Sequence, residues 1–308
     1  RRIEICIAGC IITIFMMYSI DISYQGTILL NELLLLYVFW ACQNAYVKPV
    51  EYCHLRKVSL KSIGLIIVAA IFLFIMADYV NACSMIAFQN LLDDSLQAIV
   101  NKPVEALVVV AILPAIIEEF LFRGMIYRGI ANKSNKKIAI IISALLFAFL
   151  HMNFNQMCYA FVMGLVFAIV IYLTDNLSVS ILLHMLFNAF TVIITCFEKS
   201  NAIQAILQCN IAGYTLFNPS LTDTQGKIEI SLLIIGGLIA ILSAVIAGWL
   251  ILLIAKTEKT TETTINNKNI LKDNDNIFKN NEKWKPDLRF FAGSGVCILI
   301  AILYEILL

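Results

Sequence analysis

Six polar side chains suited to acid–base chemistry lie within otherwise apolar segments of the 308-residue sequence. They are Glu118, Glu119, Arg123, His151, His184 and Asn188. An ionisable group inside a bilayer costs about 2.5–3.5 kcal/mol on insertion scales, so it marks either a functional site or an internal ion pair. Carboxylates and imidazoles transfer protons, and an imidazole with an amide can stabilise a developing negative charge. The set therefore indicates an acid–base site.

The spacing within this set places some of its members on shared helix faces. Glu119 and Arg123 are four residues apart with the acid first, which is the favourable orientation for a helical ion pair. His184 and Asn188 are also four apart, so both project from one face. Helix–helix hydrogen bonds that only hold a bundle together are an equal alternative for the Glu119–Arg123 pair alone. For the complete set, a functional site is the better explanation.

Depth in the membrane follows from the helical rise of about 1.5 Å per residue. Counted from the inner helix ends, Glu118 lies roughly 18 Å deep, His151 roughly 20 Å and His184 roughly 10 Å. His184 reaches the level of the other two only if its helix begins earlier or is tilted. Pro114 stands one turn before Glu118, removes a backbone hydrogen bond and is expected to bend the helix.

The composition indicates a membrane protein. Hydrophobic residues make up 61% of the sequence and charged residues 14%, whereas about a quarter of a soluble domain is charged. The net charge of +1 indicates no nucleic acid or acidic partner. The nine cysteines include no Cys-x-x-Cys pair, so they are expected to pack between helices as small apolar residues.

Nine apolar runs are long enough to cross a bilayer, which takes about 20 residues. They cover 3–20, 27–46, 62–82, 105–130, 138–154, 157–174, 177–197, 229–255 and 289–308. Only helices or closed barrels satisfy the backbone in lipid, and these runs are too long and continuous for barrel strands. The sequence thus predicts an all-α, polytopic bundle of about nine transmembrane helices, with the active site buried between the fourth, fifth and seventh spans.

Basic residues set the expected orientation. With the N-terminus in the cytoplasm, all but three of the 22 Lys and Arg residues fall on the inner side, the exceptions being Lys102, Lys199 and Lys227. The positive-inside rule supports this orientation and the odd number of spans. The third histidine, His54, lies in a basic inner loop and is expected to be solvated.

The remaining segments divide the chain into three parts. Residues 1–255 are expected to form the helical bundle, with a catalytic core at about 105–197. Residues 256–288 are rich in Asn, Lys, Thr and Asp, which predicts a disordered cytoplasmic linker. Residues 289–308 are the last expected helix, and 83–104 are expected to form an amphipathic helix in the outer interface.

Three short motifs resemble the CAAX-protease and bacteriocin-processing family, also called the Abi family, which includes the CAAX prenyl endopeptidase of the Ras-converting type. The motifs are Glu118-Glu119-x-x-x-Arg123, Phe147-x-x-x-His151 and His184-x-x-x-Asn188. Gly164 and the Thr-Asp-Asn-Leu turn at 174–177 also follow the family pattern. The resemblance covers about residues 105–190. Each motif alone is weak, but three in order on separate spans make a strong signal.

The resemblance implies an intramembrane endopeptidase that hydrolyses a peptide bond in a membrane-associated peptide or protein. It assigns water activation to Glu118 and His151 and stabilisation of the oxyanion to His184 and Asn188, while Arg123 would position the acids. The expected partners are the lipid bilayer and a peptide or membrane-anchored protein substrate. The expected location is a bacterial cell membrane, with the N-terminus in the cytoplasm.

Other functions are compatible with parts of the pattern. A non-catalytic scaffold or a bacteriocin self-immunity protein of the same fold would not need both histidines and Asn188. A transporter could use buried acids and histidines as a proton relay, but no inverted repeat is evident in the sequence. The sequence lacks the His-Glu-x-x-His signature of helical zinc proteases and the Gly-x-Gly-Asp of aspartyl intramembrane proteases.

Two hypotheses about a cofactor stay open. Glu118, His151 and His184 could together bind Zn²⁺, because two imidazoles and a carboxylate with an open position form a known catalytic arrangement. Asn188 shares a face with His184, which suits an oxyanion clamp better than the hydrogen-bonded surroundings of a metal ligand. We therefore expect catalysis without a required cofactor, with a divalent metal such as Zn²⁺ as the alternative.

Overall fold

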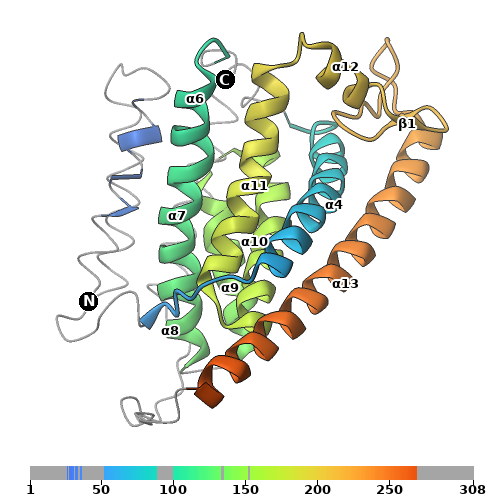
Figure 1. Cartoon of the computed structure of the whole chain (residues 1–308). Helices are drawn as coiled ribbons and strands as arrows, with labels where there is room; N and C mark the ends of the chain where they lie inside the picture. The colour runs from blue at the N-terminus through green and yellow to red at the C-terminus, as the bar shows by residue number, and fades with distance from the viewer. Residues whose placement is uncertain are drawn as a thin grey trace.

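The computed structural model describes residues 52–88, 100–132, 135–151 and 153–268, together with 26, 28–30, 32–33 and 35–36. Side chains are described as far as residue 260. Most of these residues are helical, and the long helices run up and down through one bundle (Figure 1). The elements are α4 (Leu60–Ser84), α6 (Pro103–Ala106), the π-helix η1 (Leu107–Ile112), α7 (Leu113–Glu119), the π-helix η2 (Phe120–Tyr127), α8 (Arg128–Ala131), α9 (Lys136–Leu150), α10 (Phe154–Thr174), α11 (Leu177–Cys196), α12 (Asn201–Leu207), β1 (Asn210–Ile211), β2 (Tyr214–Thr215) and α13 (Ile230–Lys268).

Four of these helices are long and apolar enough to cross a membrane: α4, α10, α11 and the part of α13 covering Ile230–Thr260. The elements α6 to α8 form one continuous helix that matches the fourth predicted span, and the shorter α9 matches the fifth. The prediction of a mainly helical membrane protein is confirmed. The predicted spans 3–20 and 289–308 lie outside the described residues, as does most of 27–46, so the count of nine stays a prediction.

Polar caps fix where the membrane helices begin. Ser59, Asn153 and Asn176 each stand just before a helix, and each side chain accepts a hydrogen bond from a backbone N–H of the first turn. Asp175 ends α10 in the left-handed conformation, with φ 49°. Asp175 and Asn176 alone connect α10 to α11, so the ends of these two helices lie together.

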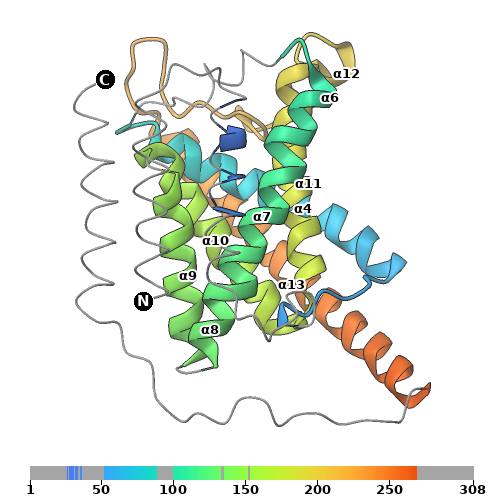
Figure 2. The same ribbon diagram turned by 90° about the vertical axis from the view of Figure 1, so that its left-hand side faces the viewer.

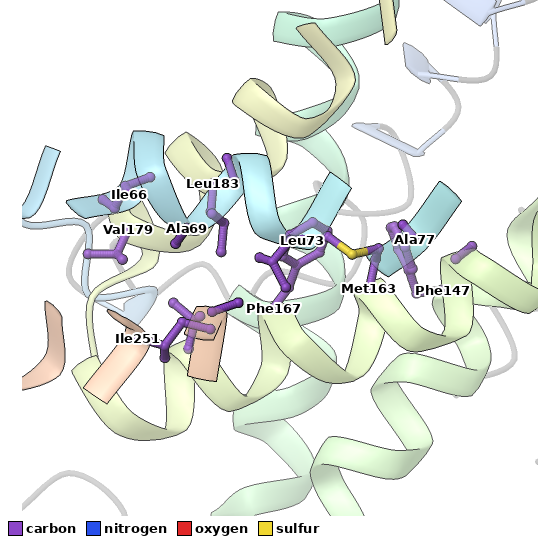
Figure 3. Packing of buried hydrophobic residues seen from close by; sticks show 14 of the residues in the cluster. Ile66, Ala69, Leu73, Ala77, Phe147, Met163, Phe167, Val179, Leu183 and Ile251 are labelled. Carbon is purple, nitrogen blue, oxygen red and sulfur yellow. The ribbon is translucent and has the colours of Figure 1, made fainter. Parts of the chain in front are cut away.

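The buried core lies among α4, α10, α11 and α13, with further side chains from α7, η2 and α9 (Figure 3). Ile66 and Leu73 of α4 meet Phe167 of α10, Leu183 of α11 and Ile251 of α13 in this cluster. Lipid is as apolar as these side chains, so the helices associate through close packing and hydrogen bonds rather than through transfer out of water.

The helices α9 and α10 approach each other closely at Gly164. A Cβ atom at this position would lie 3.0 Å from Cα and 3.2 Å from the carbonyl oxygen of Ala144 on α9. These distances are shorter than ordinary van der Waals contacts, so a side chain would push the helices apart. The close approach brings the backbone of α10 beside a buried arginine of the candidate site.

The segment between α11 and α13 forms a cap at one end of the bundle, at the upper right of Figure 1. It holds α12 and a hairpin of β1 and β2, which the all-α prediction did not include. Tyr214 is buried in a cluster with Ala82 and Leu221, and its ring centroid lies 6.4 Å from that of Tyr79. A Cβ atom at Gly236 would collide with the Tyr214 ring, so the missing side chain lets the cap rest on α13.

Two predicted features near the outer side change or stay untested. The helix α9 ends at Leu150 rather than at residue 154, because Asn153 already caps the next helix. In the predicted amphipathic segment 83–104, the long helix α4 runs on to Ser84, and residues 89–99 lie outside the described part of the chain.

The segment 256–288, predicted to be a polar cytoplasmic linker, is described only as far as residue 268, so this prediction stays open. The helix α13 continues to Lys268, well into the segment 256–288. Glu258 accounts for part of this extension, because it is buried and accepts hydrogen bonds from the backbone N–H of Ser59 at 3.2 Å and from Nδ2 of Asn176 at 3.1 Å. These bonds join the end of α13 to the caps of α4 and α11.

Candidate active site

The helices α7 and α11 bring the acids and one histidine of the predicted set together. They pack against each other and lie side by side in both views (Figures 1 and 2). The end of α7 carries Glu118 and Glu119, and η2 carries Arg123 one turn later. The facing helix α11 carries Ser180 and His184. All five side chains are buried.

The ion pair expected from the spacing of Glu119 and Arg123 is present and fully buried. Nη1 of Arg123 donates to Oε1 of Glu119 at 2.8 Å, and Nη2 donates to the carbonyl oxygen of Gly164 at 3.1 Å. The guanidinium carbon also lies 4.4 Å from the ring centroid of Phe147 and 5.2 Å from that of Phe167. Charge, hydrogen bonds and cation–π contacts therefore all fix this arginine in one place.

The carboxylate of Glu119 is surrounded by donors. Besides Arg123, Ser180 donates from Oγ to Oε2 at 2.6 Å, and His184 donates from Nδ1 to Oε1 at 3.1 Å. A buried carboxylate with three donors is stable as an anion, and its charge is already compensated within the protein. Glu119 therefore organises the site and is poorly suited to accept a proton.

The ring of His184 is held in one orientation beside Glu118. It stacks on Phe167 with 4.6 Å between ring centroids and 23° between ring planes. Because Nδ1 donates to Glu119, Nε2 faces Glu118 and lies 3.8 Å from its Oε2. This distance is too long for a direct hydrogen bond. Among the described residues no other donor holds Glu118, which leaves this carboxylate available for chemistry.

His151 lies just past the end of α9 and is partly buried. Its Nδ1 donates to the carbonyl oxygen of Phe147 at 3.0 Å, so in the neutral ring Nε2 carries the lone pair. The ring of Phe147 lies 5.1 Å from the His151 ring and 5.7 Å from the His184 ring, measured between centroids. The two imidazoles thus flank one aromatic ring, and none of the described contacts joins His151 directly to Glu118.

Asn188 has a structural partner one turn beyond His184. Pro114 has no N–H, so the carbonyl of Val110 lacks the donor that usually stands four residues further along a helix. Nδ2 of Asn188 donates to this carbonyl at 3.3 Å. Two π-helical segments lie on either side of α7, a feature that is frequent at functional sites. The bend expected at Pro114 stays a prediction.

Two buried polar residues near the site were missing from the predicted set. Ser180 stands four residues before His184, on the same helix face, and this spacing was a signal for it. Glu32 is only 2% exposed and belongs to the second predicted span. The sequence could have shown Glu32 as a candidate, because it is an ionisable residue inside an apolar run.

His54 is not simply solvated, in contrast to the expectation from sequence. Its Nδ1 donates to Oδ2 of Asp175 at 2.6 Å, and Arg128 and Arg56 donate to the same carboxylate at 2.7 and 3.3 Å. Burial alone would raise the pKa of Asp175, but the hydrogen bond from His54 and the charge of Arg128 together lower it to about 2. This cluster ties the loop before α4 to α8 and to the turn between α10 and α11.

Glu118, His151 and His184 are the residues that the sequence offered as ligands of a metal ion. Within the described part of the chain, no three His, Cys, Asp or Glu side chains lie close enough to hold a metal ion together. Each imidazole does have the kind of Nδ1 partner that zinc ligands commonly have: Glu119 for His184, and the carbonyl of Phe147 for His151. The need for a metal therefore stays an open prediction, and the reaction proposed for this site uses only the protein's own side chains and water.

The fold and the site define a class of protein: an α-helical membrane protein with a buried cluster of acids and histidines on neighbouring helices. Residues 100–190 match the family model described as type II CAAX prenyl endopeptidase Rce1-like. This segment contains all six residues of the predicted set, so the part of the chain that holds the candidate site is similar to that family.

Two curated bacterial relatives are similar to part of the chain. The membrane-embedded CAAX protease MroQ of Staphylococcus aureus (strain USA300) is 34% identical over 116 residues, which are 36% of this chain and 47% of the relative. The putative membrane peptidase YdiL of Bacillus subtilis (strain 168) is 31% identical over 87 residues, 28% of this chain and 36% of the relative. The chain thus spans less than half the length of each. No solved structure matches it significantly.

Proposed function

We propose that the protein is an intramembrane endopeptidase in which Glu118, together with His151, activates a water molecule for attack on a peptide bond. The observation that carries this proposal is the difference between the two neighbouring acids. Glu119 is compensated by Arg123 and by Nδ1 of His184, whereas the one described group within ion-pair distance of Glu118 is Nε2 of the same imidazole, at 3.8 Å. A general base needs an unengaged lone pair beside the reacting water, and Glu118 offers one next to the imidazole of His184.

The proposed reaction uses each polar side chain at a stated atom. Glu118 takes a proton from water, and the water oxygen attacks the carbonyl carbon of the peptide. His151 accepts a hydrogen bond from the same water at Nε2. His184, oriented by Glu119, donates from Nε2 of its protonated ring to the oxyanion, and the second N–H of Asn188 is the other donor. The proton on Glu118 then passes to the leaving nitrogen, which gives a free carboxylate and an amine.

The substrate is proposed to be a membrane-associated peptide or protein. The candidate site is buried among helices that are long enough to cross a bilayer, so a segment lying in or beside the membrane reaches it most directly. Names of the two relatives describe a CAAX protease and a peptidase, which agrees with a peptide substrate. We also propose a cytoplasmic N-terminus, which places Arg128 and the lysines at the end of α13 on the inner side.

Cleavage of membrane-associated peptides by the purified full chain in lipid nanodiscs tests the proposal. Products of synthetic apolar and lipidated peptides are identified by mass spectrometry. We expect turnover by the wild type and a loss of about 100-fold or more in Glu118→Gln and His151→Ala, which is the size expected for general acid–base catalysis. The matched control is Glu198→Gln, since Glu198 is an exposed acid in the outer segment.

Three outcomes separate the alternatives. Full turnover by Glu118→Gln or His151→Ala would overturn the proposed chemistry. No cleavage of any peptide by folded wild-type protein would favour a non-catalytic scaffold or self-immunity protein of the same fold. Turnover that exhaustive chelation abolishes and added Zn²⁺ restores would replace the metal-independent mechanism with a metalloprotease.

A further inference from the structure

A third buried carboxylate, Glu32, lies beside the candidate active site. It belongs to the segment between residues 26 and 36, whose described residues are helical and lie beside α7 (Figures 1 and 2). Glu32 is 2% exposed, and its Oε2 is shielded from solvent and has no hydrogen-bond partner among the described residues. Nothing in the mechanism above uses this carboxylate.

Burial along the segment shows which way Glu32 points. Leu35, three residues later, is 1% exposed and belongs to the same buried cluster as Ile117 and Leu121 of the helix that carries the catalytic acids. Leu33, by contrast, is 62% exposed. Residues three apart share a helix face, so Glu32 and Leu35 face the protein interior and not the lipid.

The charges around Glu32 do not balance. Its carboxyl lies close enough to Glu118 for the two groups to interact electrostatically. Arg123 is the one fully buried guanidinium or ammonium group among the described residues, and it is already paired with Glu119. Arg123 and the ring of His184 lie near Glu118, whereas no cation among the described residues pairs with Glu32. An unpaired carboxylate in such an environment is costly.

We propose that Glu32 binds a cationic group of the substrate peptide, either a Lys or Arg side chain or a free N-terminus, next to the bond that Glu118 attacks. Ammonium and guanidinium groups carry donors that match an unpaired carboxylate oxygen, and a positive charge compensates both acids at once. A peptide without such a group leaves the buried oxygen unpaired, which makes the site selective. The inference rests on the proposed function, because it names the substrate of the same site.

Peptide binding tests the inference without depending on turnover. Synthetic peptides share one apolar sequence and differ at a single position, which is Lys or Gln, and each is made with a free or an acetylated N-terminus. Affinity is measured for the full chain carrying His151→Ala, so that the peptide is not consumed. The protein is held in phosphatidylcholine nanodiscs, and empty nanodiscs correct for binding to lipid.

We expect the cationic peptides to bind roughly tenfold more tightly or better than the doubly neutral peptide. The acetylated Lys peptide and the free-amine Gln peptide show whether the side chain or the N-terminus is recognised. Adding Glu32→Gln should abolish the preference, Glu32→Asp should keep part of it, and Glu198→Gln should keep all of it.

Equal affinities for all four peptides would overturn the inference, and so would an unchanged preference in the Glu32→Gln variant. Hydrolysis by the chain with His151 intact is measured in parallel. Preferential binding without any cleavage would contradict the proposed function but not the cation site. Cleavage without any preference would contradict the cation site alone.

Discussion

Replacing Arg123 with Met tests how much the buried ion pair stabilises the fold. Methionine keeps much of the apolar stem, so the loss is mainly one of charge and hydrogen bonds. The variant loses the 2.8 Å bond to Glu119, the 3.1 Å bond to the carbonyl of Gly164 and the cation–π contact with Phe147. It also leaves Glu119 buried without its cation.

The expected size of the effect follows from these contacts. Removing one partner of a buried pair costs about 3–5 kcal/mol. Glu119 would keep Ser180 and His184 as donors, so we expect the lower end, about 3 kcal/mol. Adding Glu119→Gln removes the stranded charge, and the double variant should recover at least about 1 kcal/mol over Arg123→Met alone.

The assay is unfolding of the purified protein in mixed micelles with increasing denaturing detergent, followed by circular dichroism. The free energies of the wild type, the two single variants and the double variant complete a cycle. A stability of Arg123→Met within about 1 kcal/mol of the wild type would refute the reasoning. A double variant no more stable than Arg123→Met would show that the stranded charge is not the cause.

Three further changes give independent tests. Gly164→Ala should destabilise the protein by about 1–3 kcal/mol in the same unfolding assay, because the new Cβ atom forces α9 and α10 apart. The matched control is Gly248→Ala, whose Cβ atom would have no neighbour within 4 Å, and it should be neutral or slightly stabilising. Ser180→Ala should cost about 1–3 kcal/mol by removing a donor from a buried carboxylate, and it should lower kcat while leaving peptide affinity nearly unchanged. The pKa of Asp175 is lowered from 3.8 to about 2, so its stabilising contribution is complete above about pH 4 and is lost as the pH falls toward 2. Asp175→Asn keeps a residue that tolerates the left-handed conformation, so the turn itself should be preserved. The variant should lose this pH dependence, and its free energy of unfolding should fall by about 1 kcal/mol or less, because the carboxylate of Asp175 is half exposed.

Spacing along one helix predicted local contacts well. The spacing of four from Glu119 to Arg123 was enough to expect their ion pair, since the helix itself brings them together. The depth of His184 was estimated less well. Its estimated level was roughly 8 Å closer to the inner side than that of Glu118, yet the two side chains lie 3.8 Å apart. A depth counted along each helix separately ignores how the helices tilt and shift against one another.

Contacts between helices were largely beyond the reach of the sequence. The bond from Asn188 to Val110 depends on the missing N–H of Pro114, and nothing in the spacing showed that these two helices meet there. The link between His54 and Asp175 joins residues 121 apart, so the basic loop around His54 suggested solvation instead. Glu32 could have been noticed from its place in an apolar run, but the cluster that it faces is visible only in the folded chain.

The helical architecture was predictable because composition and the length of apolar runs decide it. Its boundaries were less so. Polar residues such as Thr257 and Glu258 suggested that α13 ends before them. Both are instead hydrogen-bonded within the fold: the hydroxyl of Thr257 donates to the carbonyl of Leu253 on the same helix, and Glu258 accepts from Ser59 and Asn176 on neighbouring segments. A polar sequence predicts a linker only where such partners are missing.

The central claim is that two adjacent glutamates have different tasks: Glu118 performs chemistry and Glu119 holds the site together. The most direct measurement compares Glu118→Gln with Glu119→Gln for both peptide turnover and free energy of unfolding. We predict that Glu118→Gln loses turnover by about 100-fold or more at nearly unchanged stability, whereas Glu119→Gln loses stability because Arg123 is left buried without its anion. Wild-type turnover in Glu118→Gln, or equal effects of the two variants on both quantities, would contradict the account.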